Sequence, residues 1–191
     1  MDARLERVAW RRLDLPDRDG TGLRLAEAEL DEVALDGARL ARAELADVVV
    51  RGGSWANVRA ERSTFRRVRV DGVRATGAIF AEATLRDVRF TACRLDLTSL
   101  RFARLERVAF HDCRLDEADL AGARLTSVRF ERCTLVGAVL SGAELERCEL
   151  RGCDLSGVVG PDALRGARMP LDDVIAAAPT LAAAVGVHVV E

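Results

Sequence analysis

Large apolar residues recur at every fifth position of this chain, from Leu25 to Leu155, without an insertion or a deletion. These 27 positions hold 17 Leu and 5 Phe, and from Ala28 onward the residue two positions before each of them is small. A helix repeats its apolar face every 3.6 residues and a strand every two, so neither explains this spacing. Two residues separated by one other point to the same side of an extended backbone. The next alternate residue is usually polar or Gly, so the chain must turn once every five residues. The pattern predicts a solenoid in which the small and the large position of each repeat point inward.

The number of turns in one coil follows from sorting the small positions in steps of twenty. Residues of one type then fall into columns, and the large positions add a column of Phe90, Phe110 and Phe130. Two of the columns of small residues are Val48, Val68, Val88, Val108 and Val128, and Cys93, Cys113, Cys133 and Cys153. This segregation predicts that residues n and n+20 stack in register, with four five-residue sides per coil. Twenty-seven repeats make 6.75 coils, or a rod about 32 Å long at roughly 4.8 Å per coil.

The repeat small–polar–Leu/Phe–polar–polar, as in Ala118-Asp119-Leu120-Ala121-Gly122, resembles that of the pentapeptide-repeat proteins. The resemblance covers residues 23–160 and implies an all-β fold, a right-handed quadrilateral β-helix. The resemblance is nearest to the MfpA/Qnr quinolone-resistance type, whose members bind DNA gyrase as mimics of duplex DNA. The stretch 164–186 is similar to the end of the MfpA type, although that match is short and rich in Ala.

The chain is expected to form a single domain in three parts. An N-terminal coil and turn occupy residues 1–22, the solenoid occupies residues 23–160, and a helical segment occupies residues 161–191. The five-residue pattern fades at Gly160-Pro161, and helical spacing of apolar residues begins after Pro170. Pro170 suits a first helical turn, and Pro179 is expected to end or kink this helix.

The C-terminal segment is apolar nearly all round, and one end of a coil is too small to cover every side of it. The sequence therefore predicts both a cap over the last coil and a homodimer joined through residues 164–191, an arrangement that the MfpA resemblance also implies. The predicted dimer interface consists of Leu171, Val174, Ile175, Ala178, Leu181 and Val185.

Residues 50–75 depart from the large–small rule. Trp55 takes a Leu position, Gly53 removes the small side chain beside it, and Ala60 and Ala75 take large positions. Large and small residues thus alternate along the columns, which preserves the core volume. The region is expected to be a distorted waist, which either ordinary packing drift or a functional kink explains.

Composition restricts the environment in which the chain works. The charged N-terminus lacks the apolar core of a signal peptide, and the longest apolar tract, residues 174–190, is short for a membrane span and contains Pro179. The net charge of −2 gives no global field for nucleic acids or membranes. A cytoplasmic protein without membrane contact is expected.

Candidate catalytic and metal-binding residues are few. All five Cys fall at the small inward position, where a thiol packs as a small apolar side chain and four thiols along a column cannot converge on zinc. In-register Cβ atoms about 4.8 Å apart also exceed the usual disulfide range. His111, beside Asp112, is expected to point outward, far in sequence from His188. No Ser-His-Asp set or phosphate loop appears, so the prediction is a protein without catalysis and without a cofactor.

The distribution of charge tests DNA mimicry, since a mimic needs a dense acidic surface. Residues 27–47 carry a local charge of −5, but residues 51–74 carry +5, and no single face is strongly acidic. A patchwork of this kind usually forms ion pairs in solvent. Direct nucleic-acid binding is disfavoured because Trp55 and Phe65 point inward and cannot stack on bases. The sequence predicts a protein-binding module, with DNA gyrase as one partner and a scaffolding role with an unknown protein partner as the alternative.

Overall fold

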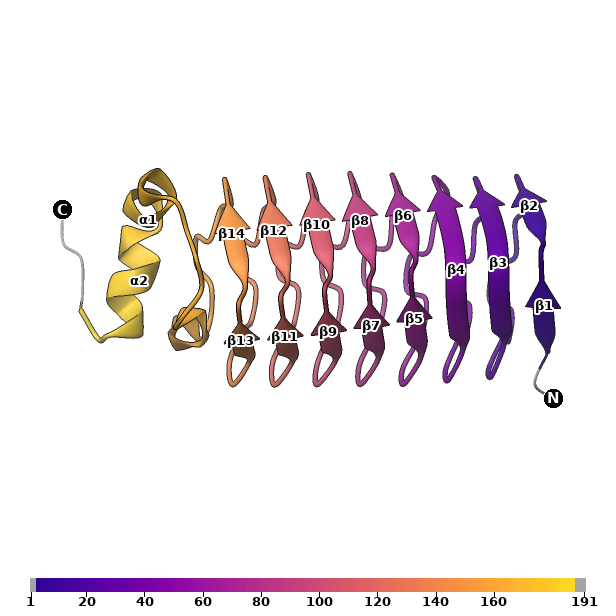
Figure 1. Ribbon diagram of the computed structural model, residues 1–191, viewed down its shortest axis with the longest axis horizontal. Coiled ribbons are helices and arrows are strands. Elements are labelled where there is room, and N and C mark those ends of the chain that lie inside the picture. Colours follow the sequence, from indigo (N-terminus) through magenta and orange to yellow (C-terminus); the bar gives the residue numbers. More distant parts are fainter. Residues whose placement is uncertain (1–2, 188–191) are drawn as a thin grey trace.

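The chain winds into a rod of stacked coils, which a computed structural model describes for residues 3–187 (Figure 1). Every β pairing between strands is parallel and joins residue n to residue n+20, for example Leu45 to Phe65 and Phe65 to Leu85, and only the isolated bridge from Glu149 to Arg168 at the end of the rod has an offset of 19 among the described residues. Isolated bridges such as Arg74 to Arg94 keep the same offset on the remaining sides of the coil. The predicted all-β quadrilateral solenoid with four five-residue sides is confirmed.

Strands form on two of the four sides. The odd-numbered short strands and the even-numbered short strands build two adjacent walls, and the long strands β3 and β4 continue across both of them. The strands are β1 (Arg4–Glu6), β2 (Ala9–Arg11), β3 (Arg24–Asp31), β4 (Glu44–Arg51), β5 (Thr64–Arg66), β6 (Arg69–Asp71), β7 (Thr84–Arg86), β8 (Arg89–Thr91), β9 (Arg104–Glu106), β10 (Ala109–His111), β11 (Arg124–Thr126), β12 (Arg129–Glu131), β13 (Glu144–Glu146) and β14 (Glu149–Arg151).

The structure adds one coil ahead of Leu25. Strand β1 pairs with the start of β3, and β2 pairs with its end, so Leu5 and Trp10 stack beneath Leu25 and Leu30. The five-residue spacing of large positions therefore begins at Leu5 in the folded chain, with Gly20 in place of a large residue before Leu25.

The core is a single column of side chains along the rod axis. The small and large positions between Leu25 and Leu155 are buried except at Gly53, Leu145 and Cys153, the last two lying in the final coil. Phe90, Phe110 and Phe130 stack with ring centroids 5.0 and 4.9 Å apart and nearly parallel planes. Offset stacking of this kind adds to the stabilisation that burial of the rings provides.

The corners of the coil explain the polar and glycine-rich positions. The residue two places after each large position has left-handed backbone geometry, with φ of 58° at Leu97 and 53° at Arg107. Side chains disfavour this geometry and Gly tolerates it, so Gly is frequent there. Corner amides ahead of the final coil donate hydrogen bonds to the next coil, as Arg107 does to the carbonyl of Thr126 at 3.0 Å.

The region around Trp55 keeps the register of the rod. Trp55 is buried, and a Cβ atom added to Gly53 would lie 2.2 Å from the carbonyl oxygen of Val33. Gly is therefore required there for the close approach of the two coils. The strands of β4, β5 and β6 remain evenly stacked through this region (Figure 1). The small residues Gly53 and Ala75 leave room for the Trp55 side chain, so the large residue does not shift the neighbouring coils.

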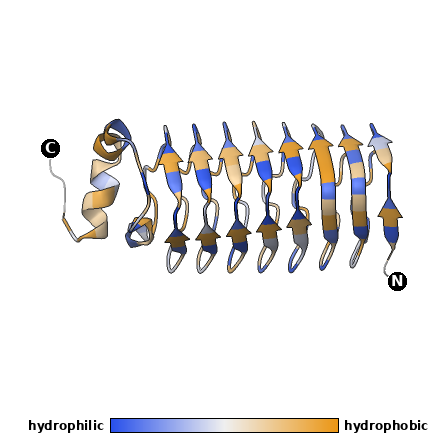
Figure 2. Ribbon diagram, in the orientation of Figure 1, coloured by the Kyte–Doolittle hydropathy of each residue, from blue (hydrophilic) through white to orange (hydrophobic). Residues whose placement is uncertain are grey.

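Short helices cover the C-terminal end of the rod. They are η1 (Pro161–Leu164), α1 (Leu171–Ala176) and α2 (Ala178–Ala184). Asp173 of α1 accepts a hydrogen bond from the amide of Gly152 at 2.7 Å, and the hydroxyl of Thr180 in α2 donates one to the carbonyl of Leu155 at 3.0 Å. Apolar residues dominate both the inner strand positions and these helices (Figure 2). Among the described residues, no helix has the length and hydropathy needed to cross a bilayer.

Candidate protein-binding surfaces

Outward side chains form ladders in which oppositely charged residues of neighbouring coils bond to each other. Arg67 bonds to both carboxylate oxygens of Asp47 at 2.6 Å, and Arg107 bonds to those of Asp87 at 2.6 and 3.0 Å. The guanidinium hydrogen bonds lower the pKa of Asp47 and of Asp87 below the ordinary value. Because each pair spans twenty residues, the register of the coils fixes the positions of these charges.

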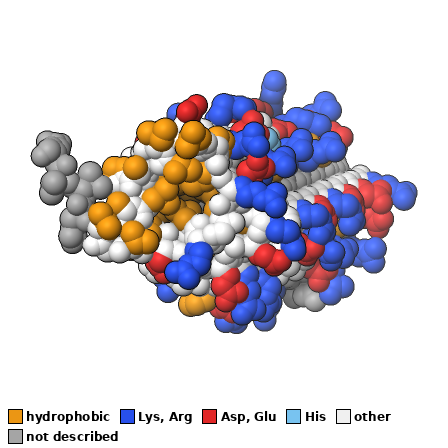
Figure 3. Space-filling model, turned by 60° about the vertical axis from the view of Figure 1, so that its left-hand side comes forward, with side chains coloured by type: hydrophobic (Ala, Val, Ile, Leu, Met, Phe, Trp, Pro, Cys, Tyr) orange, Lys and Arg blue, Asp and Glu red, His pale blue; other side chains and the backbone are white. Residues whose placement is uncertain are grey.

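The same stacking brings charges of the acidic and the basic segment of the sequence together. Residues 27–47 and 51–74 occupy successive coils, so acids of the first lie against arginines of the second. Arg51, for example, lies 3.0 Å from Asp31 and 3.3 Å from Glu29. Asp47 pairs with Arg67 and Asp36 with Arg74 in the same way, whereas Arg62 pairs with Glu82 of the following coil. The rod therefore carries mixed rows of charge along its length (Figure 3).

The cysteines occupy the interior, as the small-position pattern predicts. Cys93, Cys113, Cys133 and Cys148 are buried, Cys153 is half-buried, and all five are free thiols. The thiol of Cys133 donates a hydrogen bond to the carbonyl of Phe110 in the preceding coil at 3.4 Å. Burial raises the pKa of Cys148, and hydrogen bonds to neighbouring thiols together with burial raise that of Cys113. The raised pKa values disfavour a reactive thiolate at Cys113 and at Cys148.

His111 faces outward but does not stand alone. It is in register with Glu131, and its Nδ1 atom lies 3.1 Å from a carboxylate oxygen of that residue. The side chain is partly covered rather than freely solvated. The other histidine, His188, lies outside the described residues.

The residues predicted for a dimer interface all lie on the two helices at the end of the rod or just beyond them. Leu171, Ile175 and Val185 are strongly exposed, at 73%, 64% and 77% respectively. Val174 and Ala178 are also exposed, whereas Leu181 is half-buried against the core. Figure 3 shows hydrophobic side chains gathered over this end of the molecule. The two helices therefore cover the last coil with one side and expose the other side to solvent.

Two exposed apolar side chains interrupt the polar rows along the rod. Leu97 and Phe102 occupy successive corner positions, and the guanidinium of Arg101 lies 5.4 Å from the centre of the Phe102 ring. Phe102 was not singled out by the sequence analysis. A large apolar residue at a position usually held by Gly or a polar residue is the signal that identifies it.

Comparison with known proteins returns the same repeat. Residues 63–140 match the family model described as a pentapeptide repeat region. Among curated proteins, none matches the chain. A similar solved structure is HetL, a pentapeptide repeat protein involved in heterocyst differentiation regulation from the cyanobacterium Nostoc sp. strain PCC 7120, at 21% identity and a TM-score of 0.42, over 89% of this chain and 90% of HetL.

Another is a trypsin-treated form of QnrB1, a plasmid-mediated fluoroquinolone resistance protein, at 18% identity and a TM-score of 0.42, over 98% of this chain and all (100%) of that one. The family model matches the middle of the rod, and the same five-residue register continues without interruption to Leu25 on one side and Leu155 on the other. The middle of the rod, residues 63–140, is therefore a pentapeptide repeat region.

Proposed function

We propose that this protein is a rigid protein-binding rod that acts without catalysis. The observation that carries the proposal is the fixed spacing of its outward side chains. The apolar interior and the hydrogen bonds between coils hold each outward column in register, and ion pairs such as Arg107 with Asp87 further order the charged ends. A surface whose groups are already ordered loses less conformational entropy when a partner docks.

DNA gyrase is the proposed partner to test first. The resemblance of the repeat to the MfpA/Qnr type supports it. The pairing of Asp47, Asp87 and Asp112 with arginines favours an interaction that depends on the shape of the rod together with mixed charges, rather than on a continuous acidic surface. The same ion-paired surface also favours the alternative function, a scaffolding protein with a different protein partner.

A supercoiling assay separates these two functions. Relaxed plasmid, gyrase and micromolar protein would be incubated with and without a quinolone. Inhibition of supercoiling, or relief of quinolone inhibition, would support gyrase as the partner. The Leu120→Arg variant provides the control, because a charge in the buried core should unfold the neighbouring coils. No effect of the folded protein would remove gyrase and leave the scaffolding function.

We also propose that two copies join through residues 164–191. The exposed apolar side chains of Leu171, Ile175 and Val185 support this arrangement, because a second copy would remove them from water. A two-fold axis at this end would place the two rods end to end and leave their walls free for the partner.

A further inference from the structure

The corner between the two strand walls carries a long basic hollow. Two depressions of about 610 and 390 Å³ lie end to end there and share Arg107 and Ala109 in their linings. The depressions run from the coil of Asp47 to the coil of Glu149 and are here named the arginine groove. Seven arginines and three acidic residues line it, a net charge of +4.

The acidic residues of the groove are already engaged by arginines. Asp47 bonds to Arg67 and Asp87 to Arg107, while Glu149 accepts hydrogen bonds from Arg129 at 3.2 Å and from Arg151 at 2.6 Å. The intramolecular pairs therefore leave an excess of guanidinium groups in the groove.

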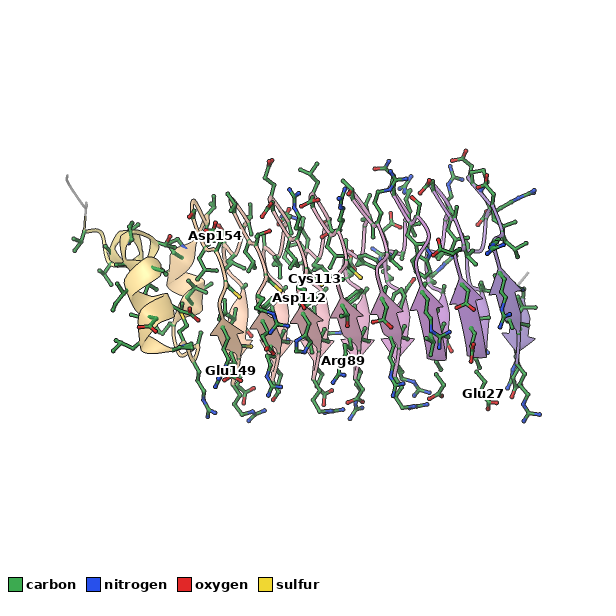
Figure 4. All side chains as sticks on the ribbon, turned by 90° about the horizontal axis from the view of Figure 1, so that it is seen from above. Glu27, Arg89, Asp112, Cys113, Glu149 and Asp154 are labelled. Carbon is green, nitrogen blue, oxygen red and sulfur yellow. The ribbon has the colours of Figure 1, made fainter. Side chains whose placement is uncertain are left out.

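Two of the guanidinium groups without an acidic partner in the described part of the chain belong to Arg69 and Arg89, in the first of the two depressions. They are register partners on β6 and β8, both are exposed, and within residues 3–187 neither has a carboxylate at ion-pair distance. Like charges directly opposite each other on adjacent strands are unfavourable. An anionic group placed between them would relieve this repulsion. Arg89 and Glu149 project from the same side of the rod, along the line of the groove (Figure 4).

The floor of the groove is apolar between the charges. Val49 is in register with Arg69, and Ala109 lies between Arg89 and Arg129, so an apolar residue flanks the Arg69–Arg89 pair on each side along the column. Val49 and Ala109 are half-buried. No aromatic residue lines the two depressions among the described residues, and single-stranded nucleic acids bind through stacking on aromatic side chains. The lining fits a polypeptide that carries both carboxylates and aliphatic side chains.

The spacing of the coils selects the conformation of that polypeptide. Successive coils are about 4.8 Å apart, a helical turn rises about 5.4 Å, and side chains on one face of an extended strand repeat at about 6.6–6.8 Å. Over three coils, carboxylates placed once per helical turn drift from the arginines by about 2 Å, whereas those of an extended strand drift by about 6 Å. A flexible arginine side chain can accommodate the smaller drift.

We propose that the arginine groove binds an acidic amphipathic α-helix of a partner protein, with the helix axis along the rod. The proposal rests on the protein-binding function and specifies the partner element that this surface recognises. Acidic side chains, one per turn, would meet Arg69, Arg89 and Arg129, the last of which also bonds to Glu149, and aliphatic side chains beside them would cover Val49 and Ala109.

A labelled synthetic helix tests this proposal directly. The probe is a peptide of about 20 residues, about 30 Å when helical, with one Glu per turn flanked by Leu and Ala. Fluorescence anisotropy would measure its binding to the full chain at low and high salt. The Arg69→Glu/Arg89→Glu variant should bind about tenfold more weakly or worse, since each exposed charge contributes up to about 1 kcal/mol and is reversed here.

The matched control is the Arg42→Glu/Arg94→Glu variant. These arginines are also exposed and without a carboxylate at ion-pair distance among the described residues, but neither lines the groove. The control should retain the wild-type affinity and salt dependence, and circular dichroism and thermal melting would confirm that both variants fold.

The proposal would be overturned by equal losses in both variants, by equal binding of a Pro-substituted peptide that cannot form a helix, or by tighter groove-dependent binding of a DNA or RNA oligonucleotide. Absence of saturable peptide binding up to millimolar concentration would also overturn it. The supercoiling assay does not use the peptide, so failure of the groove proposal and failure of the gyrase proposal are distinguishable.

Discussion

Leu120 and Leu97 show how the position within the five-residue repeat decides what a residue contributes. Leu120 occupies a large position and is 0% exposed, whereas Leu97 occupies a corner and is 56% exposed. Leu120→Ala should lower the free energy of unfolding by about 2–5 kcal/mol, because truncating a buried Leu removes contacts and leaves a cavity. Leu97→Ala should cost far less. Urea unfolding of the two variants measures the difference, and equal losses would contradict the register.

Cys113 occupies a small inward position, so substitution and thiol labelling there test whether this column is buried. Its thiol is buried and its pKa is raised by hydrogen bonds to neighbouring thiols and by burial. Cys113→Ala should change stability little, whereas Cys113→Arg should unfold the adjacent coils because it buries an unpaired charge. Thiol labelling of the native protein should be slow at Cys113 and faster at the half-buried Cys153. Rapid labelling of all five thiols would show that the column is accessible.

The ladders between coils make part of the stability dependent on pH. In the folded protein, hydrogen bonds from Arg107 lower the pKa of Asp87. A lowered folded-state pKa contributes stability that is fully present above the unfolded value, about 3.9, and is lost as the pH falls through the folded value. Asp87→Asn should therefore be less stable than wild type at pH 7, by less than about 1 kcal/mol because the pair is exposed.

The difference between wild type and Asp87→Asn should shrink when the pH is lowered through and below about 3.9. Urea unfolding at pH 7 and in acid measures it. Arg94→Gln serves as the control, since Arg94 has no carboxylate at ion-pair distance among the described residues and its removal should not change the pH dependence in this range. A difference for Asp87→Asn that is constant with pH would show that this pair contributes nothing measurable to stability.

The elements differ in how far the sequence determines them. Between Leu25 and Leu155 the register alone predicts which side chains are buried, because one rule of spacing applies to every coil. The coil of residues 3–22 was harder to recognise, since Leu13 and Arg18 occupy small positions there and Pro16 follows Leu15. These exceptions are tolerated in the terminal coil, where Leu13 and Arg18 are exposed.

The surface was predicted less completely than the core. Counting charges along the chain gave an acidic segment and a basic segment, but the neighbour of an outward residue in the fold lies twenty residues away. Asp31 with Arg51 and Asp47 with Arg67 are therefore invisible to a local count. The arginine groove likewise arises from two outward columns that lie on either side of the buried valine column, and no segment of the sequence contains it.

At the scale of the whole molecule, the rod combines polar walls with an apolar end. The helices that cover the last coil use one side for that purpose, through Ala177, Leu164 and the half-buried Leu181. Their other side carries Leu171 and Ile175, which are four residues apart on α1 and therefore share a face. Because one side of these helices is buried and the other is exposed, the same short segment can cover the last coil and, as proposed, join two copies.

Sedimentation velocity of the full chain tests the proposed dimer. The Leu171→Asp/Ile175→Asp variant should sediment as a monomer where wild type sediments as a dimer, because the interface would bury four carboxylates around the two-fold axis. Both substitutions replace side chains that already face solvent, so the fold of the monomer should be retained. Leu97→Asp, a comparable exposed site on the rod, should remain dimeric. A wild-type protein that stays monomeric at high micromolar concentration would leave the helices with the single role of covering the last coil.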